Sequence, residues 1–164
     1  MRLRAKPAVL LVALILAGCG GAGKSKPQTQ TVHGSGFEFA APVDWTVTRT
    51  GRAVGAHDGD VDRVEVRTFR LVKPYRVALF DAASRELDAV VTKLAVQLSG
   101  RVRSAETIRV AGRRARAYRI DYGGKVQELT FVLVGSTEYQ LLCRRLVQAT
   151  DEACRHLRRS FVLT

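Results

Sequence analysis

The first eighteen residues limit how much of this chain can belong to a folded domain. Arg2, Arg4 and Lys6 place positive charge at the N-terminus, and an apolar run follows at residues 8–17. A run of this length is too short to span a bilayer as a helix and is typical of the apolar segment of a signal peptide. We therefore expect residues 1–18 to direct export and to contribute nothing to the fold.

The apolar run ends in Leu16-Ala17-Gly18-Cys19, with the cysteine directly after small and aliphatic residues. This pattern resembles the bacterial lipoprotein signal. The resemblance implies cleavage before Cys19, lipidation of its thiol with acyl chains such as palmitate, and an exported protein held at the outer face of a bacterial membrane. Two acyl chains anchor stably, because each buried methylene contributes about 0.8 kcal/mol. An ordinary secretory signal, or a buried strand with a chance cysteine, remains the alternative.

The same stretch also fits the phosphate-binding loop GxxxxGK[ST], which residues 18–25 match letter for letter. The apolar run would then be the preceding strand, and residues 77–81 offer four apolar residues and an aspartate, as in a Walker B strand. That loop requires a helix beginning at its Lys-Ser pair, whose N–H groups hold the phosphates. Residues 26–36 lack apolar periodicity and contain Pro27 and two glycines. A cytosolic nucleotide-binding enzyme is therefore the distant alternative.

The remainder of the chain is basic and long enough for one domain. The net charge of +12 falls to about +9 once the three basic signal residues are removed. Residues 19–32 are rich in Gly, Lys, Gln and Thr, which predicts a flexible linker after the lipidated cysteine, and residues 33–164 form the domain. Outside a cell the available polyanions are phospholipid headgroups and wall polymers, so we expect no nucleic-acid partner. A solvated surface with scattered cations is the simpler interpretation of the charge.

Two cysteines remain once Cys19 is assigned to lipid. Cys143 and Cys154 form a pair in an oxidising compartment, and we expect a disulfide between the end of a strand and the first turn of the last helix. Such a bridge stabilises the fold by about 3 kcal/mol. Two buried free thiols remain the alternative, because the sequence does not show the Cα separation that a bridge requires.

The periodicity of apolar residues predicts two helices and several short strands. Residues 80–98 repeat apolar side chains every three or four positions, which predicts a long helix that ends at Ser99-Gly100 with the glycine in the C′ position. Strands are expected at residues 37–39 and 45–49, and a hairpin pairs residues 53–56 with 63–72. From Thr107 four strands alternate with period two between glycine turns, as in an antiparallel meander.

The last helix is expected to start near Thr150 or Asp151 and to expose Arg155, Arg158 and Arg159. Within the meander, alternation predicts which side chains share a face. The residues expected to face the helices are Ala115, Ala117, Leu129, Phe131 and Leu133, and those expected on the opposite face, as an anion-binding or partner-binding surface, are Arg114, Arg116 and Tyr118.

The layout of these elements resembles the PsbP-like family, found in the extrinsic protein of photosystem II and in exported bacterial lipoproteins. The residues that carry the resemblance are Phe37, Phe39, Pro42 and Trp45 at the start, Val110, Gly112, Ala115 and Tyr118 in a later hairpin, and Ser160-Phe161 at the end. The resemblance implies an α+β fold, an antiparallel β-sheet packed against two α-helices, and a binding or scaffolding module without catalytic residues.

One cluster has metal-ligand chemistry. His57, Asp58, Asp60 and Asp62 resemble the start of a calcium-binding EF-hand loop. Arg63 stands where that loop needs glycine, and residue 69 is phenylalanine in place of the bidentate glutamate. We interpret the cluster as a polar hairpin tip, with these residues as weak candidates for calcium or zinc.

The sequence offers no catalytic constellation. It contains no GxSxG, HExxH or CxxC motif. Ser35 and His33 lie at the edge of the domain, where no base would be held in place, and His156 belongs to a basic helix. We therefore expect a protein that is not an enzyme and has no cofactor.

Two functions remain. In the first, the domain docks an envelope protein, across the arginine-bearing sheet face or a groove between sheet and helices. In the second, a small or lipidic ligand occupies the space between sheet and helix for carriage or sensing. A roomy apolar cavity would favour the second function, and a filled core with an exposed patch would favour the first.

Overall fold

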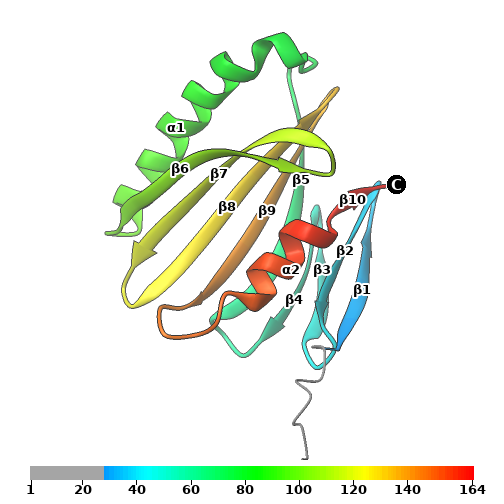
Figure 1. Ribbon diagram of the computed structural model, residues 1–164, viewed down its shortest axis with the longest axis vertical. Coiled ribbons are helices and arrows are strands. Elements are labelled where there is room, and N and C mark those ends of the chain that lie inside the picture. The colour runs from blue at the N-terminus through cyan, green and yellow to red at the C-terminus, as the bar shows by residue number, and fades with distance from the viewer. Residues whose placement is uncertain (1–27) are drawn as a thin grey trace, which may run out of the picture.

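The computed structural model describes residues 28–164 (Figure 1). Its elements confirm the predicted α+β fold class. In chain order they are β1 (Thr29–Gly34), β2 (Phe37–Pro42), β3 (Thr46–Thr50), β4 (Ala53–Asp58), β5 (Asp62–Arg70), the 3-10 turn η1 (Val77–Leu79), α1 (Phe80–Gln97), β6 (Arg101–Val110), β7 (Arg113–Tyr122), β8 (Lys125–Val134), β9 (Thr137–Leu146), α2 (Glu152–Ser160) and β10 (Val162–Leu163).

The strands form two antiparallel sheets. A small sheet has the order β1-β2-β10, and a seven-stranded sheet has the order β3-β4-β5-β9-β8-β7-β6. The predicted meander is confirmed, because β6 to β9 each pair with the next strand along the chain. The predicted hairpin of β4 and β5 is also confirmed, and β5 joins the meander by pairing with β9. Strands from before and after α1 therefore share one sheet.

Each face of the large sheet carries its own layer (Figure 1). α2 and the small sheet lie on one face, and α1 lies on the other. β7 contributes side chains to the cores on both faces of the sheet, because successive side chains of a strand point to opposite faces. Ala115 belongs to the core under α2, whereas Tyr118 and Ile120 belong to the core under α1.

This arrangement corrects the predicted faces of the meander. The prediction that Leu129 and Phe131 lie opposite Arg116 and Tyr118 is wrong. The register pairs Tyr118 with Leu129 and Arg116 with Phe131, so these four side chains share the α1 face. The alternation within each strand is as expected. The two helices cover opposite faces of the sheet, so Ala115 lies under α2 and Leu129 under α1. The sequence pattern does not reveal this arrangement.

Aromatic side chains fill the core between the two sheets. The ring of Phe37 in β2 lies 5.9 Å from the rings of both Tyr139 in β9 and Phe161, which caps the end of α2. Gly34 permits this packing, because a Cβ atom at that position would lie 2.0 Å from Cζ of Phe37. A larger residue there would displace the ring.

The end of α1 differs in one residue from the prediction. The helix ends at Gln97, and Leu98 is its C-cap. Ser99, with a φ of 52°, takes the left-handed conformation that was expected of Gly100. Gly100 has another role: a Cβ atom there would lie 2.7 Å from both the Asp121 carbonyl oxygen and the Tyr122 Cβ. The glycine is therefore needed for close approach between the helix end and β7.

Several predicted boundaries also move. β1 begins at Thr29 and buries Val32, so the part of the predicted linker at residues 29–32 belongs to the small sheet. Residues 77–81 form η1 and the start of α1, so they are not a Walker B strand. α2 begins at Glu152 as expected, but Arg158 contacts Glu128 of β8 and is only half exposed, contrary to the prediction of a solvated side chain.

The remaining predictions about the N-terminus lie outside the described residues. These concern the signal at residues 1–18, lipidation of Cys19, the phosphate-binding loop at residues 18–25 and the linker before residue 28. Between Gln28 and Thr164, neither helix has the length and apolar character needed to cross a bilayer.

Candidate functional site

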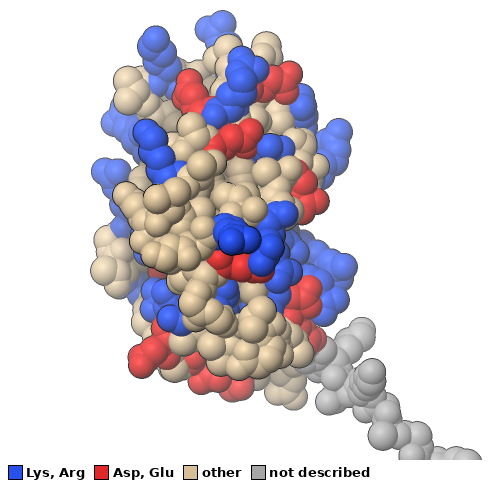
Figure 2. Space-filling view, turned by 90° about the vertical axis from the view of Figure 1, so that its left-hand side faces the viewer, with Lys and Arg blue, Asp and Glu red and all other residues tan. Residues whose placement is uncertain are grey.

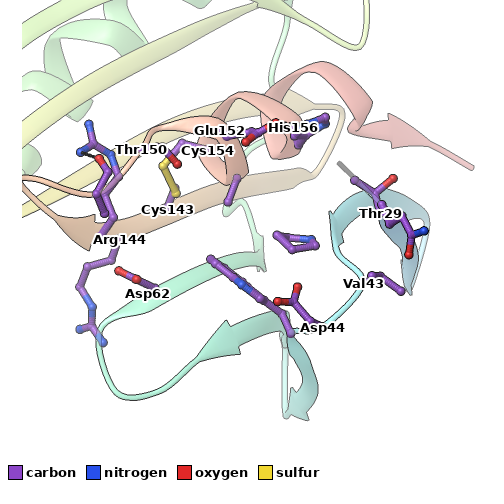
Figure 3. A pocket seen from close by; sticks show the side chains of 16 residues that line it. Thr29, Val43, Asp44, Asp62, Cys143, Arg144, Thr150, Glu152, Cys154 and His156 are labelled. Atoms are coloured by element: carbon purple, nitrogen blue, oxygen red, sulfur yellow. Dashed lines mark hydrogen bonds and ion pairs between the residues drawn. A yellow bond between two sulfur atoms is a disulfide. The ribbon is translucent and has the colours of Figure 1, made fainter. Parts of the chain in front are cut away.

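A groove of about 530 Å³ opens between α2, the end of β9 and the turn that joins β2 to β3 (Figure 3). We call it the Trp45 groove, after the aromatic residue in its wall. Its polar and charged lining residues are Gln28, Thr29, Asp44, Asp62, Arg144, Arg145, Thr150, Glu152 and His156, and the disulfide between Cys143 and Cys154 also borders it. A volume of this size suits a small molecule or one or two side chains of a partner.

Backbone contacts fix Trp45 in the wall. Its N–H donates to the Pro42 carbonyl at 3.2 Å. The side-chain Nε2 of Gln30 donates to the backbone carbonyls of Pro42 at 2.9 Å and of Trp45 at 2.7 Å, which closes the turn. The indole is half buried and packs against the core beneath α2. The turn is therefore a rigid support for one side of the groove.

The disulfide predicted from the sequence is confirmed. Cys143 of β9 and Cys154 of α2 are bonded with a Cα–Cα distance of 5.3 Å. Both residues are almost fully buried. The bridge joins α2 to the large sheet and thereby fixes two walls of the Trp45 groove relative to each other.

The guanidinium groups beside the groove are bound to backbone carbonyls. Arg144 donates to the carbonyls of Val61 at 3.0 Å and Asp60 at 2.8 Å. Arg145, which is buried, donates to the Ala149 carbonyl at 2.9 Å and lies 3.9 Å from Glu128. The two arginines therefore hold the β4–β5 turn and the β9–α2 loop in place.

A second candidate surface lies on the segment between β5 and α1. We call it the distal tip, and define it by its apolar residues Leu71, Val72, Tyr75, Val77 and Leu79. Val72 is 100% exposed, Val77 68% and Leu79 49%. A shallow hollow of about 470 Å³ lies beside Leu71, Tyr75 and Leu79. Contiguous exposed apolar patches mark interaction sites, which makes this segment a candidate surface.

The distal tip lies at the end of the molecule opposite residue 28 (Figure 1). The backbone N–H groups of Leu71 and Tyr75 donate to carbonyls of the β8–β9 turn, at 2.9 Å and 2.6 Å, which holds the tip against the large sheet. Arg70, Lys73 and Arg76 lie within the same segment. Figure 2 shows Lys and Arg side chains scattered over the face that carries α1, and several project at this end.

The predicted surface of Arg114, Arg116 and Tyr118 lies beside α1. Asp88 of α1 accepts two hydrogen bonds from Arg116, at 3.0 Å and 3.2 Å, and one from the Tyr118 hydroxyl at 2.6 Å. Arg114 donates to Asp81 of the same helix at 3.3 Å and covers the ring of Phe80. These side chains attach α1 to the sheet. Their role as a partner-binding surface stays a prediction.

This cluster shifts the acidity of its members. The hydrogen bond from Arg116, followed by that from Tyr118, holds the pKa of Asp88 below its usual value. Burial and the hydrogen bond to Asp88 raise the pKa of Tyr118 above its usual value. Asp88 is therefore ionised and Tyr118 neutral at physiological pH.

The weak metal candidates lie at the β4–β5 hairpin, as predicted. His57 Nδ1 is 3.2 Å from the Gly59 carbonyl, and Asp62 accepts from the Leu146 N–H at 3.3 Å. Across residues 28–164, no three His, Cys, Asp or Glu side chains are grouped closely enough to hold a metal ion. His33 pairs with Glu38 at 3.1 Å on the small sheet, and His156 lies 3.7 Å from Glu152.

Sequence reasoning did not identify the Trp45 groove or the distal tip. Trp45, the single tryptophan of the chain, is expected as the start of a strand and as part of the PsbP-like pattern, but not as a binding residue. The tip carries one signal that could have been used. Val72 and Val77 flank Pro74, and the strand predicted at residues 63–72 ends at Arg70 in the structure, which leaves Val72 outside the sheet.

The fold has known counterparts. The chain is similar to the solution structure of cyanobacterial PsbP (CyanoP) from Synechocystis sp. PCC 6803, with a TM-score of 0.59 and 15% sequence identity, over 91% of this chain and 99% of that one. It is also similar to a crystal structure from Bacteroides thetaiotaomicron VPI-5482, with a TM-score of 0.55 and 12% identity. That match covers 79% of this chain and 45% of the other, so the chain spans less than half of that protein.

At these identities the similarity shows the fold alone, which is PsbP-like. No protein-family model matches the sequence, and no curated protein matches it. The fold that the sequence motifs imply is thus confirmed, and function depends on the surfaces of this chain, because a fold alone does not determine function.

Proposed function

We propose that the chain is a lipid-anchored, exported binding module that docks a protein partner in the cell envelope through its distal tip. The observation that carries this proposal is the exposure of Val72, Val77 and Leu79 on one connecting segment. Burying these three side chains against a partner would contribute about 1.5–3 kcal/mol for each that becomes fully buried.

The interior supports docking over carriage. A lipid carried between sheet and helix would need space that side chains already fill. Under α1 this space holds Val91 and Ala95 against Ile120, Leu129 and Phe131, which are all almost fully buried. Under α2 it holds the aromatic core of Phe37 and Phe161.

The position of the tip suits an anchored protein. Lipid on Cys19 would place the membrane at the end of the domain where residue 28 lies, and the tip is at the opposite end (Figure 1). The nine residues from Cys19 to Pro27 span at most about 30 Å when fully extended. The anchor would thus hold the domain near the membrane, point its tip away, and raise the local concentration of tip and partner.

The charges of the tip indicate the chemistry of the partner. Arg70, Lys73 and Arg76 are exposed and lie in or next to the same segment as the apolar side chains. A complementary surface therefore has an apolar centre surrounded by Asp and Glu. The positive charges would speed association, and the buried valines would set the lifetime of the complex.

The proposal is tested by the native mass of the protein extracted gently from its own membranes. We expect a chain that begins at Cys19, carries lipid, and retains a second protein. Val72→Asp should remove the second protein and leave the lipidated chain intact, because it places a charge in the apolar centre of the interface.

The matched control is Val43→Asp, an exposed valine in the β2–β3 turn at the other end of the domain. This variant should keep the partner. An unlipidated chain that retains residues 1–18 would contradict the anchor. A complex that survives Val72→Asp would contradict docking through the tip.

A further inference from the structure

The helix α1 covers only one end of its face of the large sheet. It packs over β6 and β7, and it leaves β3, β4 and β5 without a helix on this face (Figure 1). On β5, Val64 is buried in the core beneath α2, so the alternate residues of the strand point to the uncovered face. These residues are Arg63, Glu65, Arg67 and Phe69.

The register of these strands places small residues beside the long side chains of β5. Ala53 of β4 lies between Thr50 and Arg67, and Gly55 lies opposite Glu65. Small residues in a sheet leave the floor between longer side chains low, and a hollow of about 420 Å³ lies here. We call it the arginine hollow, and define it by its lining residues Thr50, Arg52, Arg63, Glu65, Arg67 and Phe69.

The lining of the arginine hollow carries an excess of positive charge. Its single acid, Glu65, has a side chain that is only 13% exposed and accepts from Nε of Arg67. Within residues 28–164, neither Arg52 nor Arg63 forms an ion pair. Two guanidinium groups therefore keep a charge that no carboxylate of the domain compensates, and they attract an anion.

Phe69 and Thr50 narrow the class of anion. The side chain of Phe69 is 40% exposed, and an aromatic face packs against the C–H groups on the face of a sugar ring. The exposed hydroxyl of Thr50 can donate to a sugar hydroxyl or accept from one. Along β5 the backbone positions of Arg63 and Arg67 are about 13 Å apart. A chain with repeated negative charges therefore fits the two arginines better than one small anion does.

We propose that the arginine hollow binds an anionic glycan, a sugar chain that carries carboxylate groups. One sugar ring packs on Phe69, and the carboxylates pair with Arg52 and Arg63. The choice of a glycan over a nucleic acid rests on the export proposed above, because wall polymers are among the polyanions outside a cell. The hollow shares no residue with the distal tip, so docking through the tip and glycan binding can each fail without the other.

The probe for this site is hexagalacturonate, which carries one carboxylate on each sugar. It is compared with maltohexaose, a neutral glycan of the same length, and with hexaglutamate, a peptide that carries the same number of side-chain carboxylates. Titration calorimetry measures each affinity on the full chain purified in a neutral detergent. We expect saturable binding of hexagalacturonate that weakens as salt is added, and no binding of maltohexaose. Hexaglutamate should bind about tenfold more weakly, because it lacks the sugar ring that packs on Phe69.

Variants assign the binding to the hollow. Arg52→Glu, in the exposed β3–β4 turn, should weaken hexagalacturonate binding about tenfold. Phe69→Leu keeps an apolar side chain and should weaken hexagalacturonate binding without changing that of hexaglutamate. The matched control is Arg85→Glu, which makes the same change of charge at an exposed position of α1 outside the hollow, and it should bind as the unchanged protein does.

Three results would overturn the proposal. The first is the absence of hexagalacturonate binding at low salt. The second is equal affinity for hexagalacturonate and hexaglutamate, which would indicate an acidic peptide as the ligand. The third is an equal loss of binding in Arg52→Glu and Arg85→Glu, which would indicate attraction by the net charge of the domain and no defined site.

Discussion

The attachment of α1 to the large sheet gives the most specific energetic prediction. Asp88 and Asp81 are both on α1, and each pairs with an arginine of β7. The pairs differ in burial: the side chains of Arg116 and Asp88 are 17% and 42% exposed, whereas those of Arg114 and Asp81 are 46% and 79% exposed. Asp88→Asn and Asp81→Asn therefore form a matched pair of changes.

Asp88→Asn should lower the free energy of unfolding by about 2 kcal/mol. The substitution removes the negative charge that accepts from two Arg116 donors and from the hydroxyl of Tyr118, which is 3% exposed. A hydrogen bond to a charged group contributes about 1.5–3 kcal/mol, and water reaching the half-exposed Asp88 offsets part of the loss. Asp81→Asn removes one long, exposed contact and should cost less than about 0.5 kcal/mol.

Urea titration followed by circular dichroism measures the free energy of unfolding of both variants. In a thermal melt of a domain of this size, a loss of 2 kcal/mol corresponds to a decrease in Tm of about 7 °C. Equal destabilisation by the two substitutions, or a loss below about 0.5 kcal/mol for Asp88→Asn, would refute the reasoning that burial makes this pair strong.

Three further predictions concern the stability of the domain. Replacing Cys143 and Cys154 by serine should lower the free energy of unfolding by about 3 kcal/mol, measured by urea titration against the oxidised protein, since the bridge closes a loop over a sequence separation of 11 residues. Gly100→Ala should shift the thermal midpoint down by several degrees, because its Cβ would lie 2.7 Å from the Asp121 carbonyl oxygen; an unchanged midpoint would contradict the close approach. The pKa of Asp88 is lowered by its bonds from Arg116 and Tyr118, and that of Asp121 is lowered by Arg119 and Arg103 in spite of burial. The stability that these carboxylates contribute is present above their unfolded pKa of about 3.9 and should fall as the pH drops below it. In a series of thermal melts from pH 6 to pH 2, Asp88→Asn should make the decrease of Tm at low pH less steep.

The sequence predicts those parts of the fold that depend on local periodicity. Apolar residues at helical spacing define α1 nearly to its ends, and the alternation between glycine turns defines the strands of the meander. The disulfide follows from counting cysteines once Cys19 is set aside. Each of these signals lies within a short stretch of chain.

What the sequence does not predict depends on contacts between distant segments. Alternation in β7 separates Ala115 from Arg116 correctly, but it does not show which helix lies over each face. In the same way, the sequence does not show that Ser99 takes the left-handed conformation while Gly100 lies close to β7. The groove is formed by segments as distant as Trp45 and Cys154, so no local pattern identifies it.

The central claim is that the distal tip contacts a protein partner, and photo-crosslinking in living cells tests it most directly. A benzophenone amino acid at position 72 would lie in the proposed interface, and the same amino acid at position 60, in the exposed β4–β5 turn, is the control. We predict one discrete, larger species from position 72 that is absent from position 60. The same species from both positions, or none from position 72 while the protein is folded and in the membrane fraction, would contradict the account.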